Sequence, residues 1–324
     1  CAAPCLWQCS AAVPVSRCDP FPGSAGGRRL CRLSAPAGSR TTSLVRSWIA
    51  EAGLEGFAAW VTVTPAESAP QRFWVSVVDA LRQTAAGSAH VGELRAAPEF
   101  DGWAVVERLL GDLASLPDRT WLVIDDLHEL REEEARRQLE LLLMRAPSQL
   151  RFMLSTRRDV RLGLHRLRLE DELVEIRARD LRFTHPEART LFEAAGVQLS
   201  ESALALLIER TEGWAAGLRL AALSLAGHPD PDRFALDFSG SERTVAEYLL
   251  AEVLERQPEE FRRLLLRTSL LDQVSGELAD VLTGEAGGER MLQELEAANA
   301  FVLALDPQRS WFRYHRLFAD LLQL

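Results

Sequence analysis

The chain of 324 residues contains no lysine, so all 37 of its basic residues are arginine. A phosphate-binding loop of the G-x-x-x-x-G-K-[ST] type places a lysine against the β- and γ-phosphates of a nucleotide. The absence of lysine therefore excludes a complete loop of this type anywhere in the sequence.

Cysteine is confined to the beginning of the chain, at Cys1, Cys5, Cys9, Cys18 and Cys31. A disulfide framework or a zinc site is conceivable there, but the spacing matches no metal motif and no histidine lies nearby. The cysteine-free remainder is typical of proteins from a reducing compartment, so we predict a cytoplasmic location.

Long apolar runs are also absent, because no stretch reaches 18 consecutive apolar residues, and we expect no membrane span. The first residues include no Met and no basic segment followed by an apolar one, which excludes a secretory signal. Residues 1–29 are rich in Cys, Pro, Ser, Ala and Gly without periodicity, so we expect an irregular leader. We interpret the chain as a fragment or a mis-started product.

Acidic residues exceed basic ones, 47 against 37, for a formal net charge of −10. An acidic chain is a poor binder of duplex DNA, because neutralisation of the phosphates supplies most non-specific affinity. Any DNA contact is therefore expected from a segment outside this sequence.

Short apolar strands alternate with amphipathic helical segments over residues 30–185. This alternation predicts an α/β domain, with a parallel sheet covered by helices on both faces and a ligand site at the carboxyl ends of the strands. The expected strands are 28–35, 57–63, 121–124, 150–154 and 173–176, and the expected helices are 42–52, 71–84, 103–116 and 132–146.

After Thr184, which is expected to cap a helix, the pattern becomes purely helical. We expect an all-helical domain over 186–240 and a winged-helix-like domain over 241–324, because a hairpin signal at 306–309 follows several helices. The expected helices are 186–196, 201–210, 213–226, 241–256, 258–269, 275–283 and 288–298, followed by strands at 301–305 and 310–314 and a last helix near 315.

An incomplete phosphate-binding loop lies at the first strand-to-helix turn. Arg40 stands where the motif has its second glycine, Thr41 stands where it has lysine, and Thr42 keeps the hydroxyl that holds Mg²⁺. The candidate nucleotide-binding residues of this loop are Ala37, Gly38, Ser39, Arg40, Thr41, Thr42 and Ser43.

Two carboxylates, Asp125 and Asp126, end the apolar strand at 121–124. The first could hold Mg²⁺ together with Thr42, and the second could orient an attacking water, so both are candidate catalytic residues. Paired acids also end many strands as helix caps. Arg157 follows the next strand and could sense a γ-phosphate, although a solvated arginine is the alternative.

Two later motifs allow both structural and functional interpretations. Thr211–Leu218 places small residues among helix formers, which favours close helix packing in a core and allows packing against a nucleotide. His315, within Tyr314–Phe318, is either structural or part of the nucleotide site.

These motifs occur in the order found in a known family. From about residue 31 to 324, the chain resembles the STAND-type P-loop ATPase and winged-helix region of MalT-like, LuxR-family transcriptional activators. The resemblance rests on residues 34–39, 44–48, 72–74, 122–128, 172–184, 211–225, 248–249, 267–269 and 311–318.

The resemblance implies a module that binds ATP or ADP with Mg²⁺. In that family an inducer and ATP together drive self-association, and a C-terminal helix-turn-helix domain beyond a helical-repeat domain binds promoter DNA. By resemblance, Asp125 and Asp126 are the Walker B acids, Arg157 is the sensor arginine, and His315 lies where related switch ATPases contact ADP.

The chain departs from the family loop, A-P-A-G-x-G-K-T-T, at residues 35–43. Because Gly and Lys are both replaced, we predict weak nucleotide binding and negligible hydrolysis, with an obstructing side chain at Arg40. The sequence before Arg29 is a second departure, and we hypothesise that a reading-frame or gene-model error replaced the true start.

Three functions fit these observations. The first is a nucleotide-dependent switch of a transcription regulator, in which nucleotide state sets the angle between the sheet domain and the winged helix. Such a switch is expected to associate with other copies of itself. A small-molecule or protein inducer would act through a missing C-terminal domain, and DNA would bind only through a missing helix-turn-helix domain. No membrane partner is expected. The others are a working NTPase and a nucleotide-free scaffold, and a module linked to a kinase domain also fits.

Overall fold

The computed structural model describes residues 28–95 and 99–324, so the predicted leader lies outside it up to residue 27. The described residues form two compact units. The sheet unit comprises 28–35 and 41–177, and the helical unit comprises 36–40 and 178–324. The predicted phosphate-binding loop, residues 36–40, therefore groups with the helical unit, although the strand before it and the helix after it belong to the sheet unit.

A five-stranded parallel sheet forms the centre of the sheet unit, in the order β2-β3-β4-β1-β5. All five strands were predicted, and the α/β class is confirmed. Their bounds are β1 (Leu30–Ser34), β2 (Ala58–Thr62), β3 (Thr120–Asp125), β4 (Leu150–Thr156) and β5 (Leu173–Arg177).

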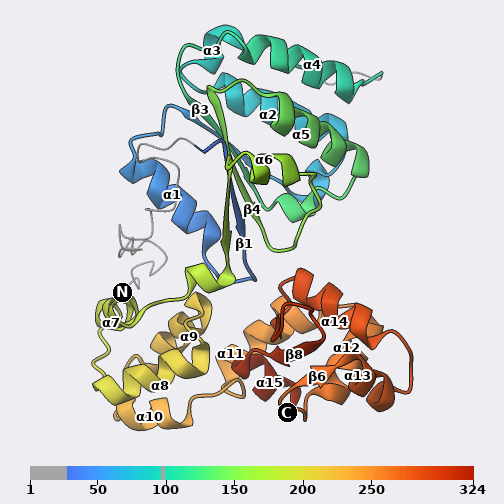
Figure 1. Cartoon of the computed structure of the whole chain (residues 1–324). Coiled ribbons are helices and arrows are strands. Elements are labelled where there is room, and N and C mark those ends of the chain that lie inside the picture. Colours follow the sequence, from blue (N-terminus) through green and yellow to red (C-terminus); the bar gives the residue numbers. More distant parts are fainter. Residues whose placement is uncertain (1–27, 96–98) are drawn as a thin grey trace. The chain divides into compact units, whose positions relative to one another are not determined.

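Helices cover both faces of this sheet, with α1 on one side and α2 and α5 on the other (Figure 1). On the α1 side, Trp48 packs edge-on against Trp121 of β3, with ring centroids 4.7 Å apart. Leu122 and Ile124 of the same strand belong to the opposite core, as the alternation of side chains along a strand requires. The helices are α1 (Thr41–Glu51), α2 (Pro70–Arg82), α3 (Gly87–His90), α4 (Gly102–Leu113), α5 (Glu133–Arg145) and α6 (His165–Leu169), with 3-10 turns η2 (Pro65–Glu67) and η3 (Leu127–Glu129).

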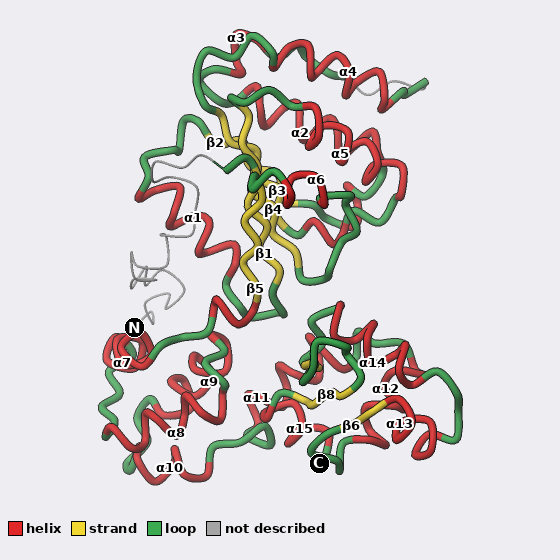
Figure 2. The backbone as a smooth tube through the Cα atoms, in the orientation of Figure 1, coloured by secondary structure: helices red, strands yellow, loops and turns green. Residues whose placement is uncertain are grey.

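The helical unit consists mostly of short helices, with a small antiparallel sheet in its C-terminal part (Figure 2). Thr184 caps the start of α7, as predicted, and its backbone N–H donates to the Glu187 carboxylate at 2.7 Å. The helices are α7 (His185–Ala194), α8 (Glu201–Thr211), α9 (Ala215–Leu225), α10 (Pro231–Asp237), α11 (Arg243–Leu249), α12 (Glu259–Thr268), α13 (Gly276–Thr283), α14 (Gly288–Ala297) and α15 (Arg316–Leu322), with a 3-10 turn η4 (Ala178–Leu181).

The predicted hairpin is confirmed as β7 (Val302–Ala304) paired with β8 (Trp311–Tyr314), and a short β6 (Val274–Ser275) pairs with β8 on its other side. The helix predicted over 241–256 is observed over 243–254, but its second half is a π-helical turn, η5 (Leu250–Leu254), that directly continues α11. Such turns insert one residue into the helical ladder, which hydrophobic periodicity does not reveal. No helix among the described residues is long and apolar enough to cross a membrane.

Trp74 and Gln138 make a buried polar contact in the sheet unit, and both are fully buried. The indole Nε1–H of Trp74 donates to Gln138 Oε1 at 2.7 Å. We predict that Gln138→Leu lowers the free energy of unfolding by about 1–3 kcal/mol, because the indole N–H loses its acceptor in the core. The exposed Gln83→Leu is the control and should shift it by no more than about 0.5 kcal/mol. Urea denaturation, monitored by circular dichroism, measures the free energy of unfolding of both variants. Equal effects of the two substitutions would contradict this role of Gln138.

Candidate functional site

Asp125 ends β3 with its side chain buried, at 2% exposure. Thr42, in the first turn of α1, donates its hydroxyl to Asp125 Oδ2 at 2.9 Å. Ser155 of β4 donates its hydroxyl to the other oxygen, Oδ1. These contacts supply the donors that a buried carboxylate requires. We term Thr42, Asp125, Asp126, Ser155 and Arg157 the strand-end cluster.

Strand register explains why these residues meet. Ser34 of β1 pairs with Thr156 of β4, and Ile124 of β3 pairs with Leu154 of the same strand. The backbone N–H of Ala35 continues the ladder to the Thr156 carbonyl at 3.2 Å. Because the strands are parallel, their carboxyl ends share one edge of the sheet. Within the sheet unit, the segments that precede and follow the loop therefore meet 124–126 and 155–157.

Asp126 follows in a left-handed backbone conformation, with φ of 54°. Burial, and then the neighbouring Asp125 carboxylate, raise the pKa of Asp126, while Arg157 opposes this shift. Arg157 Nε lies 3.8 Å from Asp126 Oδ1. The second acid is thus half-buried, opposite an arginine, and its carboxylate binds a proton more readily than a free aspartate does.

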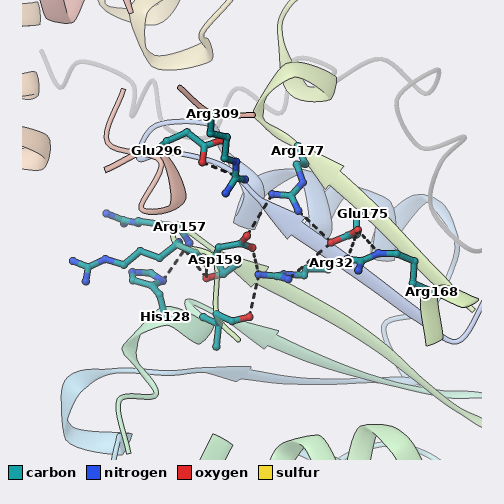
Figure 3. Close-up of polar contacts among 12 residues, drawn as sticks. Arg32, His128, Arg157, Asp159, Arg168, Glu175, Arg177, Glu296 and Arg309 are labelled. Carbon is teal, nitrogen blue, oxygen red and sulfur yellow. Dashed lines mark hydrogen bonds and ion pairs between the residues drawn. The ribbon is translucent and has the colours of Figure 1, made fainter. Parts of the chain in front are cut away.

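The segment that carries Arg157 is anchored by polar contacts (Figure 3). The Arg157 backbone N–H donates to His128 Nδ1 at 3.4 Å. Two residues later, Asp159 pairs with the buried Arg32 of β1, which also lies 3.9 Å from Glu175. The Arg157 side chain itself remains 39% exposed. A fixed backbone with an accessible guanidinium is an arrangement suited to an anionic ligand.

Mg²⁺ is the metal that the family would place here, and the donor chemistry fits it. Thr42 and Asp125 present a hydroxyl and a carboxylate within hydrogen-bond distance of each other, and Mg²⁺ prefers oxygen ligands, usually one or two from protein and the rest from phosphates and water. No group of three or more His, Cys, Asp or Glu side chains suited to a metal occurs in residues 28–95 and 99–324. A bound Mg²⁺ would therefore require ligands from a nucleotide or water.

The loop before α1 contains two residues with positive φ. Gly38 has φ of 79°, which glycine adopts freely. Arg40 has φ of 58° and an exposed side chain, a conformation that costs a non-glycine residue about 1–2 kcal/mol. Thr41 begins α1, and Ser43 is exposed on its first turn. Arg40, which stands where the family has its second glycine, thus has a left-handed backbone conformation that favours glycine.

The carbonyl groups of this loop are held inside the helical unit. The indole Nε1–H of Trp214 donates to the Ala37 carbonyl at 3.0 Å. The backbone N–H of Ala216 donates to the Gly38 carbonyl at 3.1 Å. A Cβ atom at Gly38 would lie 2.5 Å from the Ala216 Cβ. The beginning of α9 therefore fixes the loop backbone and requires a glycine at position 38.

Thr211 and Glu212, just before Trp214, bind the segment around β8 and α15. The Thr211 carbonyl accepts from His315 Nε2 at 3.0 Å. Glu212 accepts two hydrogen bonds from Arg313, at 2.6 and 2.7 Å, and one from the Arg316 backbone N–H at 3.2 Å. Burial alone would raise the pKa of Glu212. The hydrogen bonds and charge of Arg313, the charge of His315 and the Arg316 backbone N–H together outweigh burial and lower the pKa of Glu212 to about 2.

His315 lines a small recess of about 60 Å³ within the helical unit. The side chain is buried, and its Nδ1 has no hydrogen-bond partner among the described residues. Burial lowers the pKa of His315 to about 4, although the Glu212 carboxylate opposes this shift. The imidazole is therefore neutral near pH 7. The other residues that line the recess are Pro36, Ser39, Ala178, Leu181, Arg182, Glu212, Gly213, Trp214, Ala215, Asn299, Phe301, Val302 and Leu303.

The structure thus brings together Thr42, Asp125, Asp126 and Arg157 in the sheet unit, and it brings His315 to a recess lined by the loop residues Pro36 and Ser39 in the helical unit. The sequence analysis did not single out Ser155, and it included Glu212 and Trp214 only in a motif that favours helix packing. Ser155 could have been found as a hydroxyl at the end of the strand expected beside 121–124. The roles of Glu212 and Trp214 depend on partners about 100 and 177 positions away in the chain, which no local pattern reveals.

We predict that Glu212→Gln lowers the melting temperature strongly at pH 7, corresponding to about 3 kcal/mol, because Arg313 loses its buried counter-charge. The folded pKa of Glu212 lies below its usual value, so its stabilisation exists above about pH 4.5 and is lost as pH falls toward 2. The difference in melting temperature from the natural chain should therefore shrink between pH 7 and pH 3.

The control is Glu209→Gln, which removes the exposed ion pair between Glu209, in the last turn of α8, and Arg316 of α15. Its effect should stay below about 1 kcal/mol at every pH. A Glu212→Gln difference that is small at pH 7, or that grows as pH falls, would contradict the assignment.

Comparisons with known proteins match this architecture. The model of the MalT winged helix domain matches residues 250–324. The chain is 32% identical over 316 residues to the serine/threonine-protein kinase PknK of Mycobacterium tuberculosis, covering 96% of this chain and 28% of PknK. It is 31% identical to the HTH-type transcriptional regulator MalT of Serratia proteamaculans, covering 93% of this chain and 33% of MalT. The chain thus spans about a third of the length of these relatives.

Among solved structures, a Walker-type ATPase of Pyrococcus abyssi superposes with a TM-score of 0.60 at 14% identity, covering 91% of both chains. At this identity the likeness concerns the fold alone. It agrees with the order of sheet, helices and winged-helix elements described above.

Proposed function

Because the chain belongs to the MalT-like P-loop NTPases, we propose that it is the nucleotide-binding switch module of a LuxR-family transcription regulator of the STAND type, with a degenerate phosphate-binding loop. The observation that carries the proposal is the contact of Thr42 with Asp125, at 2.9 Å. This pair joins the first turn of α1 to the end of β3, where a Mg²⁺-nucleotide would be held. Asp126 and Arg157 complete the strand-end cluster as the water-orienting acid and the phosphate sensor.

The residues at positions 40 and 41 of the loop limit its affinity for a nucleotide. The first turn of α1 still presents backbone N–H groups suited to phosphates, but Arg40 is strained and exposed, and Thr41 lacks the charge of a lysine. Nucleotide binding is therefore weak and hydrolysis negligible, with Ala37, Gly38, Ser39 and Ser43 contributing through the loop and the beginning of α1.

The contacts of the loop with Trp214 and Ala216 support a switch rather than an enzyme. Movement of the loop on nucleotide binding would strain or release these two hydrogen bonds, so that ATP and ADP states differ in the helical unit. In the proposed regulator this difference controls self-association and hence transcription.

A nucleotide-free scaffold is the second candidate, and the strained Arg40 favours it. In that case the strand-end cluster would persist only as a structural contact, and Mg–ADP would not stabilise the chain.

We propose the division into 30–185, 186–240 and 241–324 for the NTPase-like, helical and winged-helix-like domains. An inducer and promoter DNA would act through parts of the regulator beyond this sequence, in the cytoplasm.

We predict that Arg40→Gly with Thr41→Lys restores nucleotide binding, because glycine relieves the left-handed strain and lysine reaches the phosphates. A hydrogen bond from a charged donor contributes roughly 1.5–3 kcal/mol, which corresponds to about 10- to 100-fold tighter binding. Isothermal titration calorimetry with Mg–ADP measures this change.

The matched control is Arg40→Lys with Thr41→Gly, which introduces the same two residues in the wrong order and should not tighten binding. Equal affinity of both double variants would contradict the proposed loop, and micromolar affinity with turnover in the natural chain would contradict its degeneracy.

We further predict that Asp125→Asn, made in the Arg40→Gly/Thr41→Lys variant, removes most of the Mg²⁺ dependence of ADP binding, because a neutral amide is a weaker magnesium ligand. Titrations with Mg²⁺ and with EDTA measure this dependence. Asp118→Asn, in the exposed turn before β3, should leave it unchanged. Retention of the full Mg²⁺ dependence in Asp125→Asn would exclude Asp125 as the magnesium-binding acid.

A further inference from the structure

The side chain of His128 connects two segments of the strand-end cluster (Figure 3). Its Nδ1 accepts a hydrogen bond from the Arg157 backbone N–H at 3.4 Å and lies 3.9 Å from Asp126 Oδ1. The ring is almost enclosed, with 8% of the side chain exposed. One imidazole is therefore adjacent both to the proposed water-orienting acid and to the backbone of the proposed phosphate sensor. All three residues belong to the sheet unit.

This hydrogen bond lies where the sheet ladder stops. The register pairing of β3 with β4 ends at Leu154, and that of β1 with β4 ends at Thr156. Arg157 is the next residue, beyond both ladders. On the neighbouring strand, Asp126 takes a left-handed conformation, with φ of 54°, and the turn η3 that follows it contains His128. The position of the Arg157 backbone therefore depends on a side-chain acceptor and not on the sheet.

The contacts of the ring determine which of its nitrogens carries the hydrogen. A backbone N–H only donates, so Nδ1 accepts with its lone pair, and in such a ring the hydrogen is on Nε2. Nε2 lies 3.6 Å from Glu129 Oε1, and a carboxylate beside one ring nitrogen favours the tautomer with its hydrogen there. Arg131 holds the other oxygen of Glu129 at 2.9 Å. The Glu129 carboxylate thus keeps Nδ1 of His128 available as an acceptor.

The side chain of Arg157 needs this support if it is to recognise a phosphate. Its Nε lies 3.8 Å from Asp126 Oδ1, and the side chain is 39% exposed, so the guanidinium can reach a ligand beside the acid. A guanidinium binds phosphate oxygens through directed hydrogen bonds, and such groups have to be held within about 0.5 Å of their working position by the residues around them. ADP has no γ-phosphate, so this contact would distinguish ATP from ADP.

We propose that His128 is a positioning residue for the phosphate sensor. By accepting a hydrogen bond from the Arg157 backbone, it holds the guanidinium where a γ-phosphate binds, and so it determines how strongly the site prefers ATP to ADP. His128 itself contacts neither nucleotide. This assignment rests on the proposed nucleotide-binding function. A merely structural His128 would stabilise the fold, and its loss would weaken the binding of both nucleotides alike.

The test compares Mg–ADP with Mg–AMP-PNP, a non-hydrolysable ATP analogue, by isothermal titration calorimetry in the Arg40→Gly/Thr41→Lys variant. In this parent, AMP-PNP should bind about tenfold more tightly than ADP, as expected of one hydrogen bond to a charged group. His128→Gln moves the acceptor away from the position of Nδ1 and should bring the ratio of the two affinities close to one, with the affinity for ADP retained. His128→Asn places a carbonyl oxygen close to the position of Nδ1 and should keep the ratio.

The matched control is His165→Gln, the same substitution at an exposed position at the start of α6, which should leave the ratio unchanged. Circular dichroism checks that all variants fold. A second measurement needs no restored loop. In the natural chain with ¹⁵N-labelled histidine, the His128 ring should show an unprotonated Nδ1 and a protonated Nε2 at pH 7.5, and its resonances are those that disappear in His128→Asn.

The outcomes separate the two proposals. A proton on Nδ1 of His128 in the natural chain would overturn the positioning role and leave the nucleotide-binding function standing. Equal weakening of both nucleotides in His128→Gln, an unchanged ratio in that variant, or a parent that binds both nucleotides equally would do the same. Loss of the ratio in His128→Asn as well would also contradict the role. If the parent binds neither nucleotide at millimolar concentration, the nucleotide-binding function fails and the role of His128 fails with it.

Discussion

A carboxylate buried at the end of a central strand needs hydrogen-bond donors, and this requirement organises the sheet unit. Asp125 is almost fully buried and obtains its donors from Thr42 and Ser155. These donors lie on α1 and β4, so the contact fixes the loop exit, the acid-bearing strand and the strand that leads to Arg157 relative to one another. An unpaired carboxylate at this depth would cost several kcal/mol. The contacts of Asp125 therefore stabilise the fold of the sheet unit whether or not the loop binds a phosphate.

The loop at residues 36–40 is held by hydrogen bonds from the beginning of α9. Its carbonyls are held by Trp214 and Ala216, and the neighbouring Thr211 and Glu212 hold the segment around His315 and Arg313. One short turn between α8 and α9 thus contacts both the phosphate loop and the winged-helix elements. In the proposed switch, this turn is where a change in the loop reaches the winged helix. In the proposed switch, these contacts would transmit a change in the loop even where the strained Arg40 weakens phosphate binding.

The sequence predicts the sheet well, because strands such as Trp121–Ile124 are short apolar runs between polar turns, and the two acids that follow mark the ligand edge. It also predicts the hairpin and the cap at Thr184. The π-helical turn after α11 and the short helices α3, α6 and α10 were not predicted, because they do not interrupt the hydrophobic pattern or are too brief to show one. For the candidate site, residue type and strand order suffice to predict that Thr42 lies near Asp125 and that Arg157 lies near Asp126.

Other parts of the site depend on tertiary contacts. The Glu212–Arg313 pair joins residues 101 positions apart, and the tautomer of His315 is determined by a backbone carbonyl, that of Thr211. From sequence, Thr211–Leu218 indicated mainly helix packing. In the structure Gly217 does pack closely beside Leu317, but Thr211, Glu212 and Trp214 contribute polar contacts that determine how the loop and His315 are held. A small-residue pattern shows that two elements can approach, and it does not show which polar groups they bring together.

Hydrogen–deuterium exchange of the natural chain and of the Arg40→Gly/Thr41→Lys variant, with and without Mg–ADP, tests the central claim most directly. The claim is that the strand-end cluster is intact in a chain whose loop binds phosphate weakly. At a nucleotide concentration that saturates the variant, peptides covering 34–45 and 120–128 should gain protection in the variant and remain unchanged in the natural chain. Protection of both peptides in the natural chain at that concentration, or no protection in either protein, would contradict this account.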